Sequence, residues 1–385
     1  MARRAKGEGS LTQTTTGWRG YATHSGKRYY VSGKTKAEAS LKLKTLVHQL
    51  GKGKTPTRDT FTVSTWLDHW MKTTETDRKP STNAGYRQSI DKYLKPTVGH
   101  VKLSKLRIEH VELAYTELRG RGLSGSTMHQ AHSILRVALK QAVWRGHLEQ
   151  NVAALVKPPT PDRSNATALS EEDLGALYAA LTGDPLRARW HLSLDIGLRP
   201  GEAIALEWKH VDFTNSTITV DQQILQVRGR GAILQESTKF GGGRRTLSAP
   251  AHIMEMLKAR RAQQQLDMIE SGDSWTSWEP DGKPHAWCFT RKDGAVLRPG
   301  YDTQLWKKLL ERAGLPHVKR YTSRHTAASM AISEGSDIAA VAEMMGHSNP
   351  NITLAVYTHA IEERKLALSA SAGARFTRLT ADKGA

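Results

Sequence analysis

The hydrophobic positions of the first fifty residues change from a strand-like to a helix-like spacing. Runs rich in aromatic and β-branched residues predict two strands, Gly17–Thr23 and Arg28–Val31, joined by a turn at His24–Lys27, with a third strand near Leu11–Thr15. Apolar residues then recur at helical spacing: Ala39, Leu43, Leu46, Val47 and Leu50. The sequence therefore predicts a small three-stranded sheet followed by one helix.

The predicted helix has a start and a stop signal. Thr35-Lys36-Ala37-Glu38 is a capping-box pattern, in which Thr35 and Glu38 would each accept a hydrogen bond from the other's backbone N–H. Gly51 ends the helix, and the Gly-, Lys- and Thr-rich residues 51–57 have the composition of a linker.

The next hundred residues are patterned as helices only. Phe61, Val63, Trp66, Leu67 and Trp70 mark the apolar side of a first helix. Further helices are expected over residues 81–94, ending before a proline at position 96, over 108–119 and over 126–145. The proline-rich residues 157–161 form a stiff linker, where we place a domain boundary.

The longest block mixes helices with a few strands. Ser170-Glu171-Glu172-Asp173 opens a helix with a cap and an acidic first turn. Thr217–Val220 is β-branched and predicts a strand, and Arg244–Ser248 predicts another strand across a glycine-rich turn.

The sequence predicts a multidomain α+β protein. The expected domains are a small sheet-plus-helix domain over residues 1–55, an all-α bundle over 60–157, and a mainly α domain with a small antiparallel sheet over 165–373, followed by a tail over 374–385. A chain of 385 residues has room for two or three domains.

Charge points to a polyanionic partner. The net charge is +19, and residues 1–60 hold 13 Lys and Arg against 3 Asp and Glu, a net of +10. Such an excess attracts nucleic acid, and its concentration in the first domain predicts a DNA-binding module there. The one cysteine, Cys288, excludes an internal disulfide, and we find neither a secretory signal nor an apolar run long enough to span a membrane. A soluble cytoplasmic protein is expected.

Three stretches of the C-terminal half carry residues suited to phosphodiester chemistry. They begin at Gly197-Leu198-Arg199, at Thr238-Lys239-Phe240, and at Tyr321-Thr322-Ser323-Arg324, the last continuing through Gly346-His347 to Val356-Tyr357. Cutting DNA without a metal needs a nucleophile, fixed positive charge on the phosphate oxygens and a proton donor for the leaving oxygen. Taken singly, each residue has an ordinary structural explanation. Residue types and spacing therefore predict a basic DNA-cleaving site and nothing more specific.

The order of these residues resembles the tyrosine recombinase family, also called the phage integrase family. The resemblance implies that Arg199 and Arg324 are the two phosphate-binding arginines and that Glu202 holds Arg199 in place. It implies that Lys239, in a β-hairpin, protonates the 5′ leaving oxygen.

The resemblance continues to the end of the domain. His347 corresponds to the histidine that hydrogen-bonds near the scissile phosphate, and Tyr357 to the nucleophile that forms a 3′-phosphotyrosyl intermediate. One position departs from the family, which usually has histidine where this chain has Tyr321. A phenol titrates near 10 and an imidazole near 6.5, so Tyr321 is a poor base at neutral pH and is expected to orient groups by hydrogen bonding.

The resemblance covers nearly the whole chain and implies the partners. Residues 1–55 resemble an arm-type DNA-binding domain and 60–157 a core-binding domain. We therefore expect arm-type and core-type attachment sites in double-stranded DNA, a homotetramer on DNA, a DNA-bending host factor, an excisionase, and action on DNA in the cytoplasm of a bacterial host. The reaction would be integration and excision of a phage or integrative element.

Two other functions stay open at this stage: a catalytically silent DNA-binding regulator of the same fold, and a chromosome-dimer resolving recombinase. The complete set of site residues argues against the first and the N-terminal module against the second. No cofactor and no metal are expected, because carboxylates are not clustered and the close pair His129 and His132 is interpreted as a pair on a helix surface.

Overall fold

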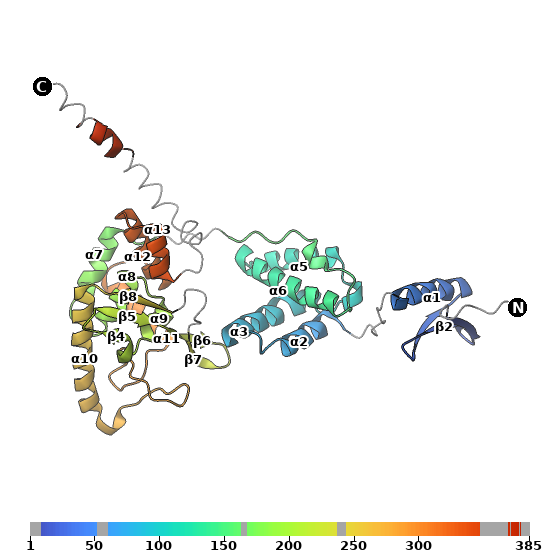
Figure 1. Ribbon diagram of the computed structural model, residues 1–385, viewed down its shortest axis with the longest axis horizontal. Coiled ribbons are helices and arrows are strands. Elements are labelled where there is room, and N and C mark those ends of the chain that lie inside the picture. Colours follow the sequence, from blue (N-terminus) through green and yellow to red (C-terminus); the bar gives the residue numbers. More distant parts are fainter. Residues whose placement is uncertain are drawn as a thin grey trace. The chain divides into compact units, whose positions relative to one another are not determined.

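The computed structural model describes residues 9–51, 61–162, 168–236, 244–346, 369, 371–376 and 378 (Figure 1). The chain divides into two compact units, residues 1–163 and 164–385, which are described separately. None of the helices in these described ranges is long and apolar enough to cross a membrane.

The first part of unit one is the predicted sheet and helix. Strands β1 (Ser10–Thr14), β2 (Gly17–His24) and β3 (Lys27–Gly33) form an antiparallel sheet in chain order, and α1 (Lys36–Gly51) packs on one face of it. Its core consists of apolar residues from both layers: Ala22, Leu43, Leu46 and Leu50, with Leu11, Tyr29, Val31 and Val47 at the edge. The expected strands and helix are confirmed.

The cap of α1 differs in one bond from the expected box. The Glu38 N–H donates to Thr35 Oγ1 at 3.2 Å, as predicted, and the Glu38 carboxylate accepts mainly from the Lys34 N–H, at 2.8 Å. Glu38 therefore stabilises both the turn that follows β3 and the first turn of α1.

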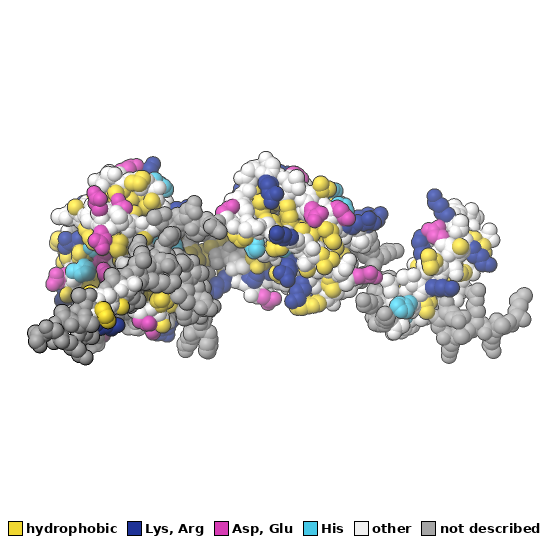
Figure 2. All heavy atoms as spheres, turned by 90° about the horizontal axis from the view of Figure 1, so that it is seen from above, with side chains coloured by type: hydrophobic (Ala, Val, Ile, Leu, Met, Phe, Trp, Pro, Cys, Tyr) yellow, Lys and Arg dark blue, Asp and Glu magenta, His cyan; other side chains and the backbone are white. Residues whose placement is uncertain are grey.

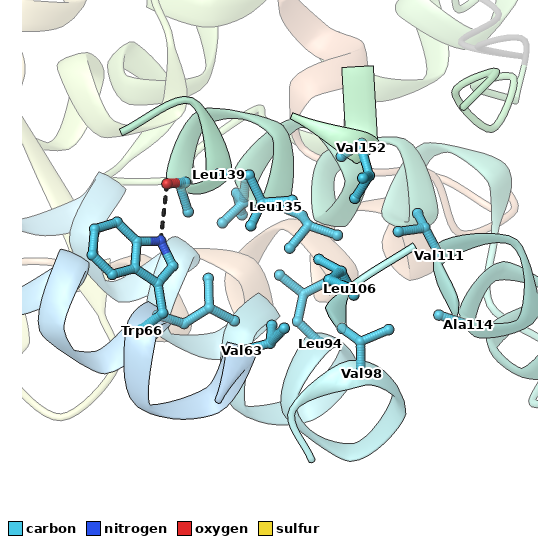
Figure 3. Close-up of a cluster of buried hydrophobic side chains, with 14 of the residues drawn as sticks. Val63, Trp66, Leu94, Val98, Leu106, Val111, Ala114, Leu135, Leu139 and Val152 are labelled. Atoms are coloured by element: carbon cyan, nitrogen blue, oxygen red, sulfur yellow. Dashed lines mark hydrogen bonds between the residues drawn. The ribbon is translucent and has the colours of Figure 1, made fainter. Parts of the chain in front are cut away.

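The second part of unit one is a helical bundle. It consists of α2 (Val63–Thr73), α3 (Pro80–Ser89), a π-helical turn (Ile90–Leu94), α4 (Lys95–Val98), a 3₁₀ turn (Leu103–Lys105), α5 (Ile108–Gly120), α6 (Gly125–Trp144) and a second 3₁₀ turn (Val152–Ala154). Its core brings Trp66 of α2 against α6, where the indole N–H donates to the Ala138 carbonyl at 3.0 Å (Figure 3).

Two predictions for this bundle are wrong. The second helix does not end before Pro96, because the π-helical turn leads directly into α4 with Pro96 in its first turn, where the ring costs no hydrogen bond. His132 does not lie on the surface: it is buried, and its Nδ1 lies 2.5 Å from the hydroxyl of Tyr115.

Unit two contains helices around two small sheets. Its helices are α7 (Glu171–Ala180), α8 (Arg187–Leu194), α9 (Pro200–Ile204), α10 (Ala251–Ser271), α11 (Pro299–Arg312), α12 (Tyr321–Ser333) and α13 (Ile338–Met345), with 3₁₀ turns at Trp208–His210 and Gly272–Ser274. The expected box at α7 is confirmed, since Ser170 Oγ and Asp173 Oδ2 each accept from the other's N–H.

The strands of unit two are arranged differently from the expectation. β4 (Val211–Asp212), β5 (Thr217–Val220) and β8 (Arg245–Ser248) form one sheet in that order, while β6 (Gln222–Val227) and β7 (Gly231–Glu236) form a separate hairpin that the sequence reasoning missed. β5 pairs with β8 so that Val220 faces Arg245. Lys239 belongs to the chain between β7 and β8, which lies outside the described residues.

Candidate functional site

Arg199 stands at the start of α9, where its position follows from the local sequence. Pro200 is suited to the first turn of a helix, and Glu202, one turn in, accepts from the Arg199 backbone N–H at 2.9 Å. The same carboxylate accepts from Arg199 Nη1 at 2.6 Å. Glu202 therefore fixes both the backbone and the guanidinium of Arg199, as the resemblance implied.

Arg245 is a second partner of Glu202 that the sequence reasoning did not single out. Its Nη1 and Nη2 donate to the two carboxylate oxygens at 3.2 and 2.8 Å, and it is almost fully buried. The sequence showed only a strand beginning at the Arg244–Arg245 pair; the pairing of β8 with β5 is what directs Arg245 toward Glu202. No sequence signal distinguishes the two arginines.

Arg324 lies in the first turn of α12 and is 1% exposed. Its Nη1 donates to the Gly197 carbonyl at 2.6 Å, and its Nη2 donates to the Met345 carbonyl. Gly197 has φ +68°, a backbone conformation that favours glycine, and a Cβ there would also require the end of the Met345 side chain to move. The arginine thus bridges the turn before Arg199 and the end of α13.

The three arginines meet at the C-terminal end of α13. Arg245 Nε donates to the Met344 carbonyl at 2.8 Å, Arg324 to that of Met345, and Arg199 Nη2 to that of Gly346 at 3.0 Å. The last carbonyls of a helix lack partners within it and carry partial negative charge, so cations suit this position. The arginines therefore fix the point from which the chain continues to His347.

The site keeps a net positive charge around one buried carboxylate. Burial opposes ionisation of Glu202, but hydrogen bonds from Arg245 and the charges of Arg245 and Arg199 lower its pKa below the usual value. Burial, together with the nearby charge of Arg199, lowers the pKa of Arg324 to about 10. Arg324 therefore stays charged at neutral pH.

Tyr321, the position that departs from the family, lies beside these arginines. It is the first residue of α12 and is 42% exposed. Burial opposes the charge of Arg199, but the Glu202 carboxylate and a hydrogen-bonding contact with the Tyr321 hydroxyl raise the pKa of Arg199. The phenol therefore lies close enough to the Arg199 guanidinium to favour its charged form.

The structure brings together four of the predicted site residues and leaves three outside its described part. Arg199, Glu202, Tyr321 and Arg324 converge, whereas Lys239, His347 and Tyr357 lie outside the described residues. A groove of about 730 Å³ runs beside the arginine cluster between β8 and α13, and it is lined by Arg244, Arg245 and Gly346 among others. Glu343 also lines this groove, so its charge is mixed.

The N-terminal sheet presents a second basic surface, on the face opposite α1. Arg19 lies over the Tyr30 ring at 4.4 Å, and Arg28 over the Tyr21 ring at 4.9 Å. Tyr21 and Tyr30 are paired across β2 and β3. Lys and Arg side chains also stand out on this body in Figure 2. Stacked arginines keep their N–H groups free to meet phosphate or base edges.

Two family models match the sequence. The model described as "Phage integrase family" matches residues 167–364, and "Phage integrase, N-terminal SAM-like domain" matches residues 62–118. The first match alone covers half of the chain and includes the three arginines, Glu202 and Tyr321.

Curated relatives align over most of their length. The "Tyrosine recombinase XerC-like" protein of Caldanaerobacter subterraneus subsp. tengcongensis is 28% identical over 354 residues, which are 88% of this chain and 89% of the relative. An "Integrase" of Streptomyces ambofaciens is 28% identical over 371 residues, 92% of this chain and 93% of the relative.

Two solved structures share the fold at lower identity. The Tn1549 transposon integrase in complex with a circular intermediate DNA has a TM-score of 0.67 at 18% identity and covers 80% of this chain and 99% of its own. A lambda integrase tetramer bound to a Holliday junction has a TM-score of 0.54 at 14% identity and covers 88% of this chain and 96% of its own.

Proposed function

The chain belongs to the phage integrase family and is a site-specific tyrosine recombinase, and from this premise we propose that it integrates and excises a mobile element with Tyr357 as its nucleophile. The observation that carries the proposal is the convergence of Arg199, Arg245 and Arg324 on the end of α13. His347 and Tyr357 follow α13 in the sequence, so the three arginines lie where the segment that supplies the nucleophile begins.

The proposed roles are those that the family resemblance implies, and each suits the chemistry of its side chain. Tyr357 attacks the phosphorus while its phenol gives its proton to a solvent water molecule, a Tyr–O–P bond forms, and the bond to the 5′ oxygen breaks. Lys239 gives a proton to that oxygen, and His347 hydrogen-bonds the phosphate. The phosphotyrosyl ester keeps the bond energy, so a 5′ hydroxyl can attack in reverse and rejoin the strand without a cofactor.

The two arginines have different access to the phosphate. The Arg199 side chain is 28% exposed, and Arg324 is 1% exposed beneath it. Arg199 would bind a non-bridging phosphate oxygen directly. In the described contacts, Arg324 uses two of its five N–H groups on the Gly197 and Met345 carbonyls. Its buried charge would stabilise the negative charge that develops on the phosphate. Tyr321 would orient Arg199 and the phosphate by hydrogen bonding.

The partners of this chain are proposed on charge and on the relatives. Residues 1–55 would bind arm-type sites, and 60–157 with 165–373 would hold a core-type site in a homotetramer. The +19 net charge and the Arg–Tyr stacks support DNA as the ligand, and the similar Tn1549 and lambda integrases have been solved bound to DNA. A DNA-bending host factor and an excisionase complete the proposal.

A suicide substrate tests the nucleophile. In DNA nicked next to the cut, the released fragment diffuses away and the covalent protein–DNA complex accumulates. We expect wild type to give this complex on a denaturing gel and Tyr357→Phe to bind the same DNA without forming it, because phenylalanine has no oxygen. The matched control is Tyr301→Phe, since Tyr301 is an exposed tyrosine of α11 in the same unit.

Either of two results would reject the assignment. One is a covalent complex from Tyr357→Phe, which would place the nucleophile elsewhere. The other is specific binding without any complex from wild type, which would make the chain a DNA-binding regulator of the same fold.

A further inference from the structure

We propose that His191, Asp195 and His252 form a binding site for a divalent transition-metal ion, separate from the arginine cluster. His191 lies in α8, Asp195 caps the end of α8, and His252 lies in the first turn of α10. One candidate ligand atom from each residue lies within 4.8 Å of the other two. The site was not visible in sequence, because His252 is far along the chain from the other two.

The geometry directs both imidazoles to a single carboxylate oxygen. His191 Nδ1 and His252 Nε2 each lie 2.8 Å from Asp195 Oδ2. In a tetrahedral zinc site, bonds of about 2.1 Å put neighbouring ligand atoms about 3.4 Å apart. Lengthening each nitrogen–oxygen separation by about 0.6 Å would let one ion replace the two protons that now lie on these hydrogen bonds. His252, whose side chain is 48% exposed, has room for that shift.

A neighbouring tyrosine holds the carboxylate in place. The Tyr178 hydroxyl donates to Asp195 Oδ1 at 2.7 Å, and its ring stacks on His191 with centroids 4.9 Å apart and planes 11° apart. Burial and the Asp195 carboxylate raise the pKa of Tyr178, so the phenol stays a donor. Outer groups of this kind orient metal ligands and are part of a working site.

The donor set selects the class of ion. Two imidazoles and one carboxylate suit Zn²⁺, Co²⁺, Ni²⁺ or Cu²⁺, whereas Mg²⁺ and Ca²⁺ favour oxygen ligands alone. Three protein ligands leave a coordination position open, which is on the solvent side next to His252. Burial opposes ionisation of Asp195, but hydrogen bonds from the two histidines and Tyr178 lower its pKa, so the ligand is a carboxylate.

The site lies close to the recombinase centre without sharing a residue with it. Asp195 is two residues before Gly197, whose carbonyl accepts from Arg324. An ion here would link the end of α8 to the start of α10. It would thereby restrict the motion of the turn between Asp195 and Arg199. We therefore expect the ion to stabilise unit two and take no part in the cleavage chemistry.

Zinc titration of the chelator-treated full chain, against a coloured competing chelator, tests the proposal. We expect wild type to bind one more ion per chain than His252→Ala, or to bind it at least about 100-fold more tightly. Tyr178→Phe should weaken binding about tenfold. His317→Ala, which removes an exposed histidine of the same unit, should bind like wild type. Zinc should raise Tm in wild type and not in His252→Ala.

A second measurement needs no variant. Zinc should slow acylation of His252 by diethyl pyrocarbonate in the wild-type chain, read by mass spectrometry, and leave His317 unchanged. Equal zinc binding by wild type and a folded His252→Ala, or equal acylation of His252 with and without zinc, would overturn the proposal and leave a hydrogen-bonded cluster. Because other histidines, such as His347 and His359, can also bind zinc, only the difference at His252 counts.

Discussion

Tyr321 stands where the family resemblance implies a histidine. We expect its hydroxyl to orient groups by hydrogen bonding in place of that histidine. The phenol lies near Arg199, whose charged form it favours, and is partly exposed at the start of α12. We expect Tyr321→Phe to slow cleavage about tenfold to a hundredfold, the loss of one transition-state hydrogen bond, and Tyr321→His to keep activity. Single-turnover cleavage of a nicked substrate, from about pH 6 to 9, measures both.

Arg324→Ala provides the comparison at the same scale. It removes a fixed charge from the transition state and should cost far more than Tyr321→Phe. A Tyr321→Phe variant that cuts as fast as wild type would reduce Tyr321 to a packing residue. One that is as inactive as Tyr357→Phe would make it a principal catalyst.

The end of α13 is the element whose position the site depends on. Arg245 joins the end of α13 to Glu202, because it donates to the Met344 carbonyl and to the Glu202 carboxylate. Arg245→Met keeps a side chain of similar volume but leaves Arg199 as the one arginine bonded to Glu202 in the described contacts. Breaking a buried pair from one side is strongly unfavourable, so we expect a loss of about 3 kcal/mol in the free energy of unfolding of unit two. Urea unfolding followed by tryptophan fluorescence measures it.

Arg291→Met is the matched control for this element. Arg291 pairs with Asp293 on the surface, where both side chains are about half exposed, and its loss should cost under about 1 kcal/mol. Equal midpoints for the two variants would mean that Arg245 does not hold α13. A destabilised Arg245→Met should also cleave more slowly even where it is folded, because the segment carrying Tyr357 starts from α13.

At the scale of the whole molecule, we expect the N-terminal domain to be separable. Its core and the core of the helical bundle share no residue among those described. Removing residues 1–55 should therefore leave cleavage of an isolated core site unchanged and severely reduce integration, because a second DNA-binding module raises effective concentration at distant sites. Gel assays of both reactions, with the full chain beside the truncated one, provide the measurement.

Salt dependence gives the same prediction an independent readout. Each phosphate contact contributes about −0.9 to the slope of log affinity against log salt, so the truncated chain should lose affinity for arm-type DNA and keep the slope for core-type DNA. Integration by the truncated protein at the rate of the full chain would contradict the arm-type assignment.

Local patterns in the sequence were sufficient for most elements. The strands and helix of the first domain, the helices of the bundle and the Ser170 cap follow from alternation, helical spacing and capping, which act between near neighbours. Arg199 and Glu202 were identified through the family resemblance, and the structure places them three residues apart at the start of α9. Pro96 misled because a π-helical turn, which depends on packing, allowed the helix to continue.

Only the tertiary structure decided which distant residues meet. Arg245 was an unremarked strand residue until the pairing of β5 with β8 placed it on Glu202, and His252 became a partner of Asp195 only because α10 packs on α8. The sequence could not show that the three carbonyls at the end of α13 accept from the arginines, because every residue has a backbone carbonyl. The sequence by itself determined the residue types and the local elements; long-range packing, which no short pattern encodes, decided their convergence.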